Sequence, residues 1–181
     1  ELMGIEIERR FLVDGRELTP WRECDSISIS QCYLSGVSHL EDKIMWNGNL
    51  LATDSRKITG ISTWRIRLHD GAVTLTAKGF RTNATASEYE WPLSVDLYDS
   101  LPLDGLPGVS KTRYLWPGED GLLWEVDEFE GRLAGLIIAE VELESEDQEV
   151  AIPPWTGLEL TNLRGWSNAS LSTMIKDSEQ N

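Results

Sequence analysis

The stretch that decides the fold reads Glu6-Ile7-Glu8-Arg9-Arg10-Phe11. Because successive side chains of a β-strand point to opposite faces, a strand here places both glutamates and Arg10 on one face and the apolar residues on the other. Like charges two residues apart recur in five later segments, Arg65-Ile66-Arg67, Glu88-Tyr89-Glu90, Lys111-Thr112-Arg113, Glu125-Val126-Asp127 and Glu140-Val141-Glu142. The pattern predicts six strands, each charged on one face and mostly apolar or aromatic on the other.

Strands of this kind favour a mainly β (α+β) fold in which a closed antiparallel barrel of roughly eight strands has a charged interior. Eight segments carry strand patterns, at residues 4–13, 28–34, 62–68, 72–78, 84–91, 111–116, 122–129 and 137–144. The apolar exterior of such a barrel must be covered, and helical segments near 18–25, 93–101 and 168–176 are the available covers or plugs. Residues 36–60 are compatible with a long hairpin excursion or an extra pair of strands.

Composition limits the classes of function. We interpret residues 1–181 as a single domain, because the chain has no internal repeat, low-complexity linker or clear boundary. The formal net charge of -15 argues against a general nucleic-acid or anionic-membrane surface, although it does not exclude an anionic substrate. No apolar stretch reaches the roughly 20 residues of a membrane-spanning helix. Cys24 and Cys32 form neither a metal-site spacing nor a disulfide framework, so we expect a cytoplasmic protein.

The basic residues on the patterned strands form a candidate anion site. They are Arg10, Arg65, Arg67, Lys78, Lys111 and Arg113. Arginine offers a planar fork that matches phosphate oxygens, and lysine supplies a point charge. A single charged pair is most often a solvated strand face. Repetition on at least three strands, always opposite an apolar face, favours a shared interior. Tyr33, which shares a strand face with Gln31, is expected either to reach a ligand in that interior or to pack.

The acidic residues on the same strands form a candidate metal site. They are Glu6, Glu8, Glu88, Glu90, Glu125, Asp127, Glu140 and Glu142. Hard divalent cations such as Mg²⁺ or Mn²⁺ prefer carboxylate oxygens together with water and substrate phosphates. A second interpretation is that these carboxylates only balance the charge of the clustered basic residues. We expect both interpretations to hold.

The ordered motifs resemble those of the CYTH family, also called triphosphate tunnel metalloenzymes. The resemblance begins with an ExExK-like signature at residues 6–10 and continues through Gln31-Cys32-Tyr33-Leu34, Arg65-Ile66-Arg67, Thr76-Ala77-Lys78-Gly79 and Glu88-Tyr89-Glu90. It then runs through Lys111-Thr112-Arg113, residues 124–129, residues 139–143, residues 155–161 and Trp166-Ser167-Asn168. It covers nearly the whole chain, and the small bacterial inorganic triphosphatases are the most similar members.

The resemblance implies an eight-stranded antiparallel tunnel that binds a triphosphate with Mg²⁺ or Mn²⁺ and is plugged by a C-terminal helix. It assigns the six basic residues to the phosphates and Glu6, Glu8 and Glu142 first to the metal, with Glu140, Asp127, Glu125, Glu88 and Glu90 lining the acidic half. We expect Tyr33 among the substrate-binding residues and Glu8, Arg10 and Glu142 as the catalytic residues. Two features depart from the family pattern: Arg10 replaces the usual lysine of the signature, and residues 36–60 are longer than the equivalent hairpin in compact members. We expect this excursion to cap the tunnel, alter the substrate or mediate an oligomer.

Inorganic triphosphate, or tripolyphosphate, is the leading expected substrate. A class IV adenylate cyclase that converts ATP to cyclic AMP and pyrophosphate is the first alternative, and hydrolysis of thiamine triphosphate is the second. A polyphosphate- or nucleotide-binding module without turnover is the third. No nucleic-acid or membrane partner is expected, and both a monomer and a homodimer are compatible with the sequence.

Overall fold

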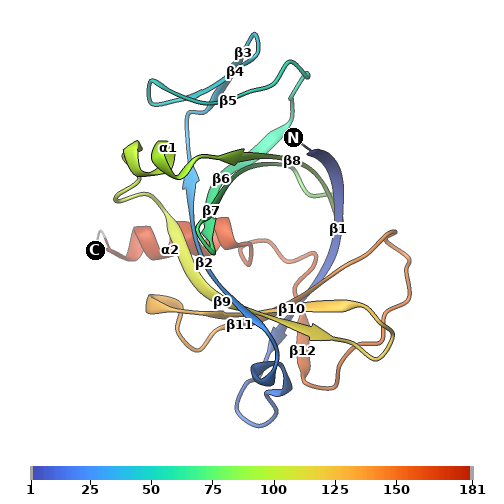
Figure 1. The fold of residues 1–181 in the computed structure, drawn as a ribbon. Coiled ribbons are helices and arrows are strands. Elements are labelled where there is room, and N and C mark those ends of the chain that lie inside the picture. Colours follow the sequence, from blue (N-terminus) through green and yellow to red (C-terminus); the bar gives the residue numbers. More distant parts are fainter. Residues whose placement is uncertain (1, 180–181) are drawn as a thin grey trace.

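A computed structural model describes residues 2–179 of the chain. In this part, eight antiparallel strands close into a barrel (Figure 1). They are β1 (Leu2–Val13), β2 (Ser26–Leu34), β6 (Ile61–His69), β7 (Ala72–Gly79), β8 (Thr85–Leu93), β9 (Gly108–Pro117), β10 (Leu123–Phe129) and β11 (Ile137–Glu142). Their order is β11-β10-β9-β2-β6-β7-β8-β1, and pairing of β1 with β11 closes the ring. The predicted closed barrel is confirmed.

A short strand, β12 (Thr156–Glu159), was not expected from the sequence. It pairs with the end of β1, where Phe11 is opposite Glu159 and Val13 is opposite Thr156. Because β8 pairs with β1 over residues 2–7, β12 continues the same edge of β1 beyond the end of β8. The long first strand is therefore paired along both edges.

Residues 38–53 form a separate sheet of three strands, β3 (Ser38–Leu40), β4 (Lys43–Trp46) and β5 (Asn49–Thr53). The turn between β4 and β5 is Asn47-Gly48, whose positive φ angles of 48° and 77° suit the tight hairpin turn that this dipeptide favours. Buried Ile44 packs with the outward-facing Ile66 and Leu75 of the barrel wall. The excursion thus covers the exterior of the barrel, and no residue of 36–60 is among the described residues that line the tunnel.

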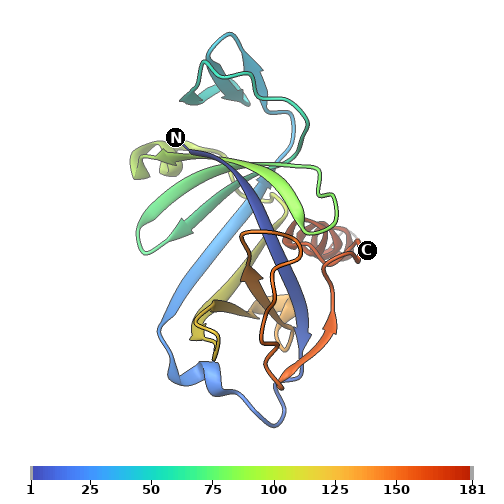
Figure 2. The ribbon, with the colours of Figure 1, turned by 90° about the vertical axis from the view of Figure 1, so that its right-hand side faces the viewer.

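A second apolar cluster covers the opposite side of the barrel (Figures 1 and 2). A 3-10 turn, η1 (Pro20–Glu23), places Trp21 against Trp155, with ring centroids 4.8 Å apart. The Trp21 ring nitrogen donates a hydrogen bond to Glu128 at 2.9 Å. The helical segment predicted at 18–25 is therefore a single 3-10 turn that covers the exterior.

The helix α2 (Asn168–Glu179) closes one end of the barrel. Its Leu171 is buried with Val109, Phe129 and Ile138, which lie on the inward-facing side of β9, β10 and β11. An apolar layer therefore lies below the charged interior, as expected of a plug. The two other short elements are α1 (Val95–Ser100), in the predicted 93–101 region, and η2 (Gly131–Leu133).

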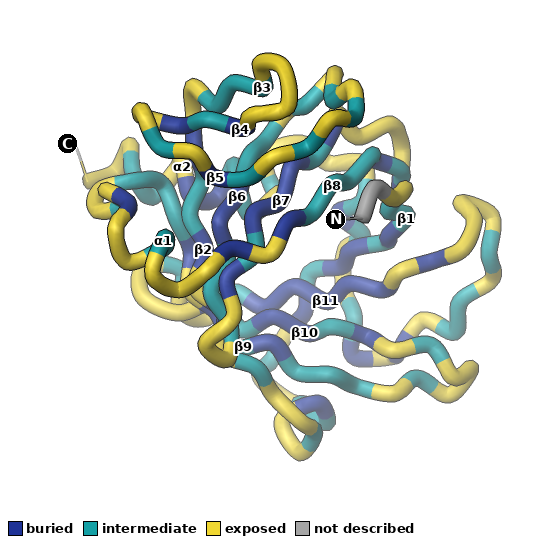
Figure 3. The backbone as a smooth tube through the Cα atoms, turned by 45° about the horizontal axis from the view of Figure 1, so that its top comes forward, coloured by how far each residue is buried: buried dark blue, intermediate teal, exposed yellow. Residues whose placement is uncertain are grey.

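Burial follows the strands of the barrel, whereas the connecting loops are mostly exposed (Figure 3). No helix in the described residues is long and apolar enough to cross a membrane.

Candidate active site

The barrel encloses a cavity of about 830 Å³. Fourteen of the fifteen predicted site residues line it, namely Glu6, Glu8, Arg10, Tyr33, Arg65, Arg67, Lys78, Glu88, Glu90, Lys111, Arg113, Glu125, Glu140 and Glu142. Because each strand sends alternate residues inward, the charged pairs of neighbouring strands meet in one space. We call this cavity the tunnel.

Strand register decides which charges face each other. Arg10 is opposite Glu140, and its Nε donates to Glu140 Oε1 at 3.1 Å. By contrast, Glu8 is opposite Glu142, so two carboxylates are neighbours across β1 and β11. Directly opposed like charges are destabilising unless a cation lies between or beside them. The register thus creates both ion pairs and a locally acidic patch.

Two arginines of β6 lack an acidic partner within the described residues. Arg65 donates to the Thr76 hydroxyl at 3.2 Å, and Arg67 donates to the Gln31 side-chain oxygen at 2.9 Å. Burial, together with the charges of Arg65 and Arg113, lowers the pKa of Arg67 to about 10. Among the described residues, the buried Arg65 Nε and Arg10 Nη2 have no hydrogen-bond partner. These groups are free donors that suit an anion.

Asp127 is the predicted site residue that does not line the cavity, although it lies on the same strand face as Glu125. Lys111 Nζ donates to its Oδ2 at 2.6 Å, and Arg113 Nε donates to its Oδ1 at 2.7 Å. Both oxygens are thus engaged by cations, and this arrangement favours charge compensation over the expected metal contact. Burial lowers the pKa of Lys111 to about 8, although the Asp127 carboxylate opposes that shift.

The acidic half of the tunnel holds an excess of negative charge. Burial and the charges of Glu140 and Glu6 raise the pKa of Glu8 well above its usual value. Burial, followed by repulsion from Glu6, raises the pKa of Glu88 to about 7. Burial and neighbouring carboxylates also raise the pKa of Glu142. Burial acts in the same direction on Glu6, but the Lys78 ammonium outweighs it and the pKa lies below its usual value.

These carboxylates fit a hard divalent cation by their chemistry. They are oxygen donors, and burial, followed by repulsion from neighbouring carboxylates, raises the pKa values of Glu8 and Glu142. Within residues 2–179, no three His, Cys, Asp or Glu side chains are grouped closely enough to hold a metal by themselves. Mg²⁺ commonly binds through one or two carboxylates plus water and substrate phosphates, so two glutamates suffice.

Comparison with known proteins places the chain in a family. The sequence profile of the CYTH domain matches residues 52–174. An inorganic triphosphatase of Acetivibrio thermocellus is 31% identical over 172 residues, 93% of this chain and 94% of that protein. The chain belongs to the CYTH family. An inorganic triphosphatase of Nitrosomonas europaea is 32% identical over 173 residues, 94% of this chain and 98% of that protein.

Solved structures extend the CYTH relationship to the fold. The crystal structure of an inorganic triphosphatase matches 92% of this chain and 93% of its own, with 29% identity and a TM-score of 0.58. The family expected from the sequence motifs is therefore confirmed, and so is the fold.

Several polar residues of the CYTH tunnel were not predicted. Arg81, on the loop between β7 and β8, forms ion pairs with Glu6 and Glu8 at 3.2 and 2.8 Å. Asn168, at the start of α2, accepts a hydrogen bond from Lys111 Nζ at 3.1 Å. Arg164 lines the tunnel from the loop before α2. None of the three lies on an alternating strand, so strand periodicity carries no signal for them.

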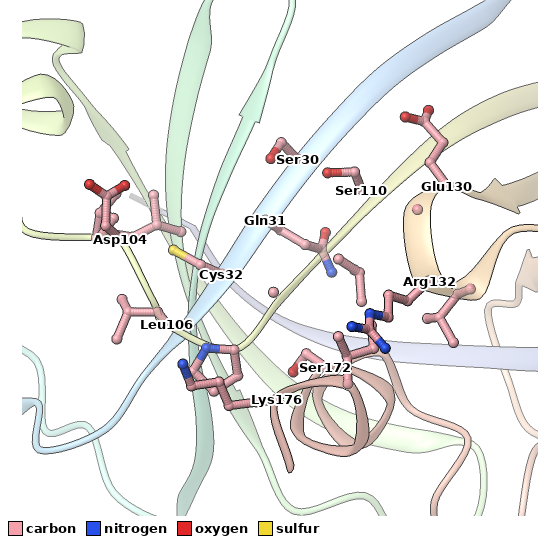
Figure 4. Close-up of a pocket in the computed structure, with 18 of the residues that line it drawn as sticks. Ser30, Gln31, Cys32, Asp104, Leu106, Ser110, Glu130, Arg132, Ser172 and Lys176 are labelled. Carbon is pink, nitrogen blue, oxygen red and sulfur yellow. The ribbon is translucent and has the colours of Figure 1, made fainter. Parts of the chain in front are cut away.

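A second cavity, of about 620 Å³, lies outside the barrel beside α2 (Figure 4). Its lining includes Cys32, Asp104, Arg132 and Lys176. Burial raises the pKa of the Cys32 thiol to about 11, so little reactive thiolate forms near neutral pH. This cavity borders β2, β9 and α2 and, within residues 2–179, shares no lining residue with the charged tunnel.

Proposed function

We propose that this chain hydrolyses inorganic triphosphate in its tunnel, with Mg²⁺ or Mn²⁺ as the metal that its CYTH chemistry requires. Both relatives named above are inorganic triphosphatases, and each aligns with more than nine-tenths of this chain. The observation that carries the proposal is the pair Arg65 and Arg67, inward-facing cations with no carboxylate partner in the described residues. Cations removed from water are costly unless an anion completes their environment.

The charge of the tunnel supports an anion bound together with metal. Eight basic and seven acidic side chains line the cavity. A polyphosphate alone leaves the acidic half uncompensated, and divalent ions alone leave Arg65 and Arg67 uncompensated. A triphosphate bound with divalent ions adds little net charge and supplies an opposite charge to each half. This complementarity favours the complex over either component.

The basic side chains are the proposed phosphate ligands. Arg10 keeps its Nε on Glu140, so its unpartnered Nη2 is available for a substrate oxygen. Gln31 donates to the Tyr33 hydroxyl at 2.7 Å, and the hydroxyl proton of Tyr33 therefore remains available for a second acceptor. Together with Arg67 and Lys78, these donors hold the chain of phosphates and neutralise the charge that develops on its oxygens.

Glu6, Glu8 and Glu142 are the proposed first metal ligands. Glu88, Glu90, Glu125 and Glu140 belong to the same acidic lining. A divalent ion held by these glutamates would polarise phosphoryl oxygens and lower the pKa of bound water. Glu8, Arg10 and Glu142 remain the proposed catalytic set, because they bring carboxylate and guanidinium groups together across β1 and β11.

The tunnel lining disfavours the alternative substrates. Tyr33 and Phe80 are the aromatic residues among the described lining, and no tryptophan is included. The excursion at 36–60, which was the candidate source of an adenine pocket, packs on the outer wall instead. Neither a nucleobase pocket nor an aromatic platform for thiamine therefore has a clear provider in residues 2–179.

The decisive experiment measures phosphate, pyrophosphate and cyclic AMP release from tripolyphosphate, ATP and thiamine triphosphate, each with Mg²⁺, Mn²⁺ or EDTA. We expect orthophosphate release from tripolyphosphate that requires metal. Glu8→Gln should abolish this turnover, whereas Glu119→Gln, the same charge change on an exposed loop, should not. Cyclic AMP as the main product would establish a cyclase, and absence of turnover with every substrate would leave a binding module.

A further inference from the structure

Arg81 makes an ion pair that competes with the proposed metal. Its Nη2 donates to Glu8 Oε1 at 2.8 Å and to Glu6 Oε1 at 3.2 Å. Glu6 also keeps Lys78 at 2.9 Å, whereas Arg81 is the one ion-pair partner of Glu8 within the described residues. The Arg81 guanidinium therefore neutralises Glu8, one of the three glutamates proposed as the first metal ligands.

The contact and a bridging metal exclude each other. A divalent ion shared by Glu6 and Glu8 needs lone pairs on facing carboxylate oxygens at about 2.0–2.6 Å. Arg81 already uses one oxygen of each glutamate. Two cations at the same pair of oxygens repel each other at short range, so one must leave.

Arg81 differs from the basic tunnel residues that lie on the barrel strands. Arg10, Arg65, Lys78 and Arg113 belong to barrel strands, whose hydrogen-bonded ladders fix their backbones. Arg81 belongs to a short loop, and its side chain is 28% exposed. Its Nη1 donates to the Ala84 carbonyl oxygen at 2.7 Å, so the guanidinium also has a contact within its own loop that does not depend on the carboxylates. It can move away from the carboxylates without disrupting a strand of the barrel.

We infer that Arg81 is a displaceable counter-cation that neutralises Glu6 and Glu8 in the metal-free tunnel and leaves when the divalent ion binds. The inference rests on the metal requirement of the proposed function. Displacement opposes metal binding, so Arg81 sets the metal affinity below the value that the glutamates alone give.

The test measures Mn²⁺ affinity without substrate, from the electron paramagnetic resonance signal of free Mn²⁺. Arg81→Met should tighten Mn²⁺ binding roughly tenfold, as expected when the two competing ion pairs with Glu6 and Glu8 are removed together. Arg164→Met is the matched control, because Arg164 is an exposed loop arginine of the same tunnel with no ion pair in the described residues. Loss of the Arg164 charge acts on the metal only through long-range electrostatics, which salt screens. It should therefore change the Mn²⁺ affinity less than about twofold.

A second pair of variants tests the direct contact. In a Glu8→Gln background, Arg81→Met should tighten Mn²⁺ binding less than it does in the wild-type background, because only the 3.2 Å ion pair with Glu6 remains to be removed. Arg81→Lys retains the charge but loses the planar fork, so it should tighten binding by less than Arg81→Met. Circular dichroism establishes that each variant is folded. If Arg81→Met is not folded, tighter binding by Arg81→Lys than by wild type is the required result.

The outcomes separate this inference from the proposed function. Mn²⁺ binding by Arg81→Met that is no tighter than by Arg164→Met overturns the inference. Absence of Mn²⁺ binding in every variant overturns both the inference and the metal requirement. Tighter binding by Arg81→Met in a protein that never hydrolyses tripolyphosphate supports the counter-cation and overturns only the proposed activity.

Discussion

At the scale of single residues, the tunnel mixes satisfied and unsatisfied cations. Arg113 forms ion pairs with Asp127 and Glu125 at 2.7 and 2.6 Å. Arg67 has the Gln31 amide oxygen instead, and Arg65 and Arg113 repel it. A buried arginine whose charge is unfavourable in the empty tunnel fits a ligand-binding role better than a stabilising one.

This contrast predicts opposite effects on stability. Because the folded protein lowers the pKa of Arg67, its charged form destabilises the fold at every pH below about 10. Arg67→Met should therefore raise the free energy of unfolding of the ligand-free protein by about 1 kcal/mol while it reduces kcat/KM roughly 100-fold. Urea unfolding in EDTA and steady-state kinetics with tripolyphosphate measure the two effects.

Arg113→Met is the matched variant. Loss of the Arg113 guanidinium leaves the buried Asp127 with Lys111 as its one ion-pair partner among the described residues. The free energy of unfolding should therefore fall by roughly 3 kcal/mol. Equal destabilisation by both variants would contradict the assignment of Arg67 as an uncompensated cation.

Glu88 predicts a pH dependence of stability. Its folded pKa of about 7 lies above the usual 4.5, so its contribution is fully present below pH 4.5 and is lost as the pH rises through 7. Glu88→Gln removes this loss. The stability of the variant minus that of wild type should therefore be larger at pH 8 than at pH 5. Thermal unfolding in EDTA at the two pH values measures the difference, with Glu119→Gln as the exposed control. A difference between Glu88→Gln and wild type that is the same at both pH values would refute the prediction.

At the scale of elements, α2 forms the floor of the tunnel. Leu171 enters the apolar layer with Val109 and Phe129, while Asn168 accepts from Lys111 at the boundary with the charged layer. One helix therefore closes the barrel and positions a proposed phosphate ligand.

Truncation of the plug tests this role. Leu171→Ala should lower the free energy of unfolding by about 2–5 kcal/mol, because Leu171 is 3% exposed and its loss leaves a cavity. Met174→Ala on the same helix should change it little, since Met174 is 55% exposed. Urea unfolding of the two variants gives the comparison. Similar values for both would mean that α2 does not close the barrel in solution.

Alternation along strands made most of the barrel and its lining predictable, because a period of two fixes which side chains turn inward. Asp127 shows the limit of that signal. It alternates like Glu125, but both of its carboxylate oxygens accept hydrogen bonds from cations of β9. Those partners depend on the pairing register, which the sequence of one strand does not reveal. Arg81 lies on a loop and Asn168 at a helix start, where alternation has no meaning. The strand β12 is too short and too exposed to leave a pattern.

At the scale of the whole molecule, charge is divided between the inside and the outside. Eight of the 16 basic residues line the tunnel, against seven of the 31 acidic residues. The acidic excess that gives a net charge of -15 therefore lies outside the lining, while the tunnel is near balance. An acidic exterior disfavours long polyanions such as nucleic acids, and a small anion bound with metal ions experiences the local tunnel charge instead.

Ligand binding should therefore stabilise the entire barrel. The tunnel lining comes from all eight strands, so a bound complex connects the strands on opposite sides of the ring. A non-hydrolysable imido analogue of triphosphate with Mg²⁺, at about 100 times its Kd, should add about 2.7 kcal/mol. For a chain of this size that corresponds to a rise in Tm of about 5–10 °C. Differential scanning calorimetry measures it, and Arg67→Met should show a much smaller rise. An equal rise with Na₂SO₄ and MgCl₂ at matched ionic strength would mean a general ionic effect, because sulfate cannot span the basic and acidic halves together.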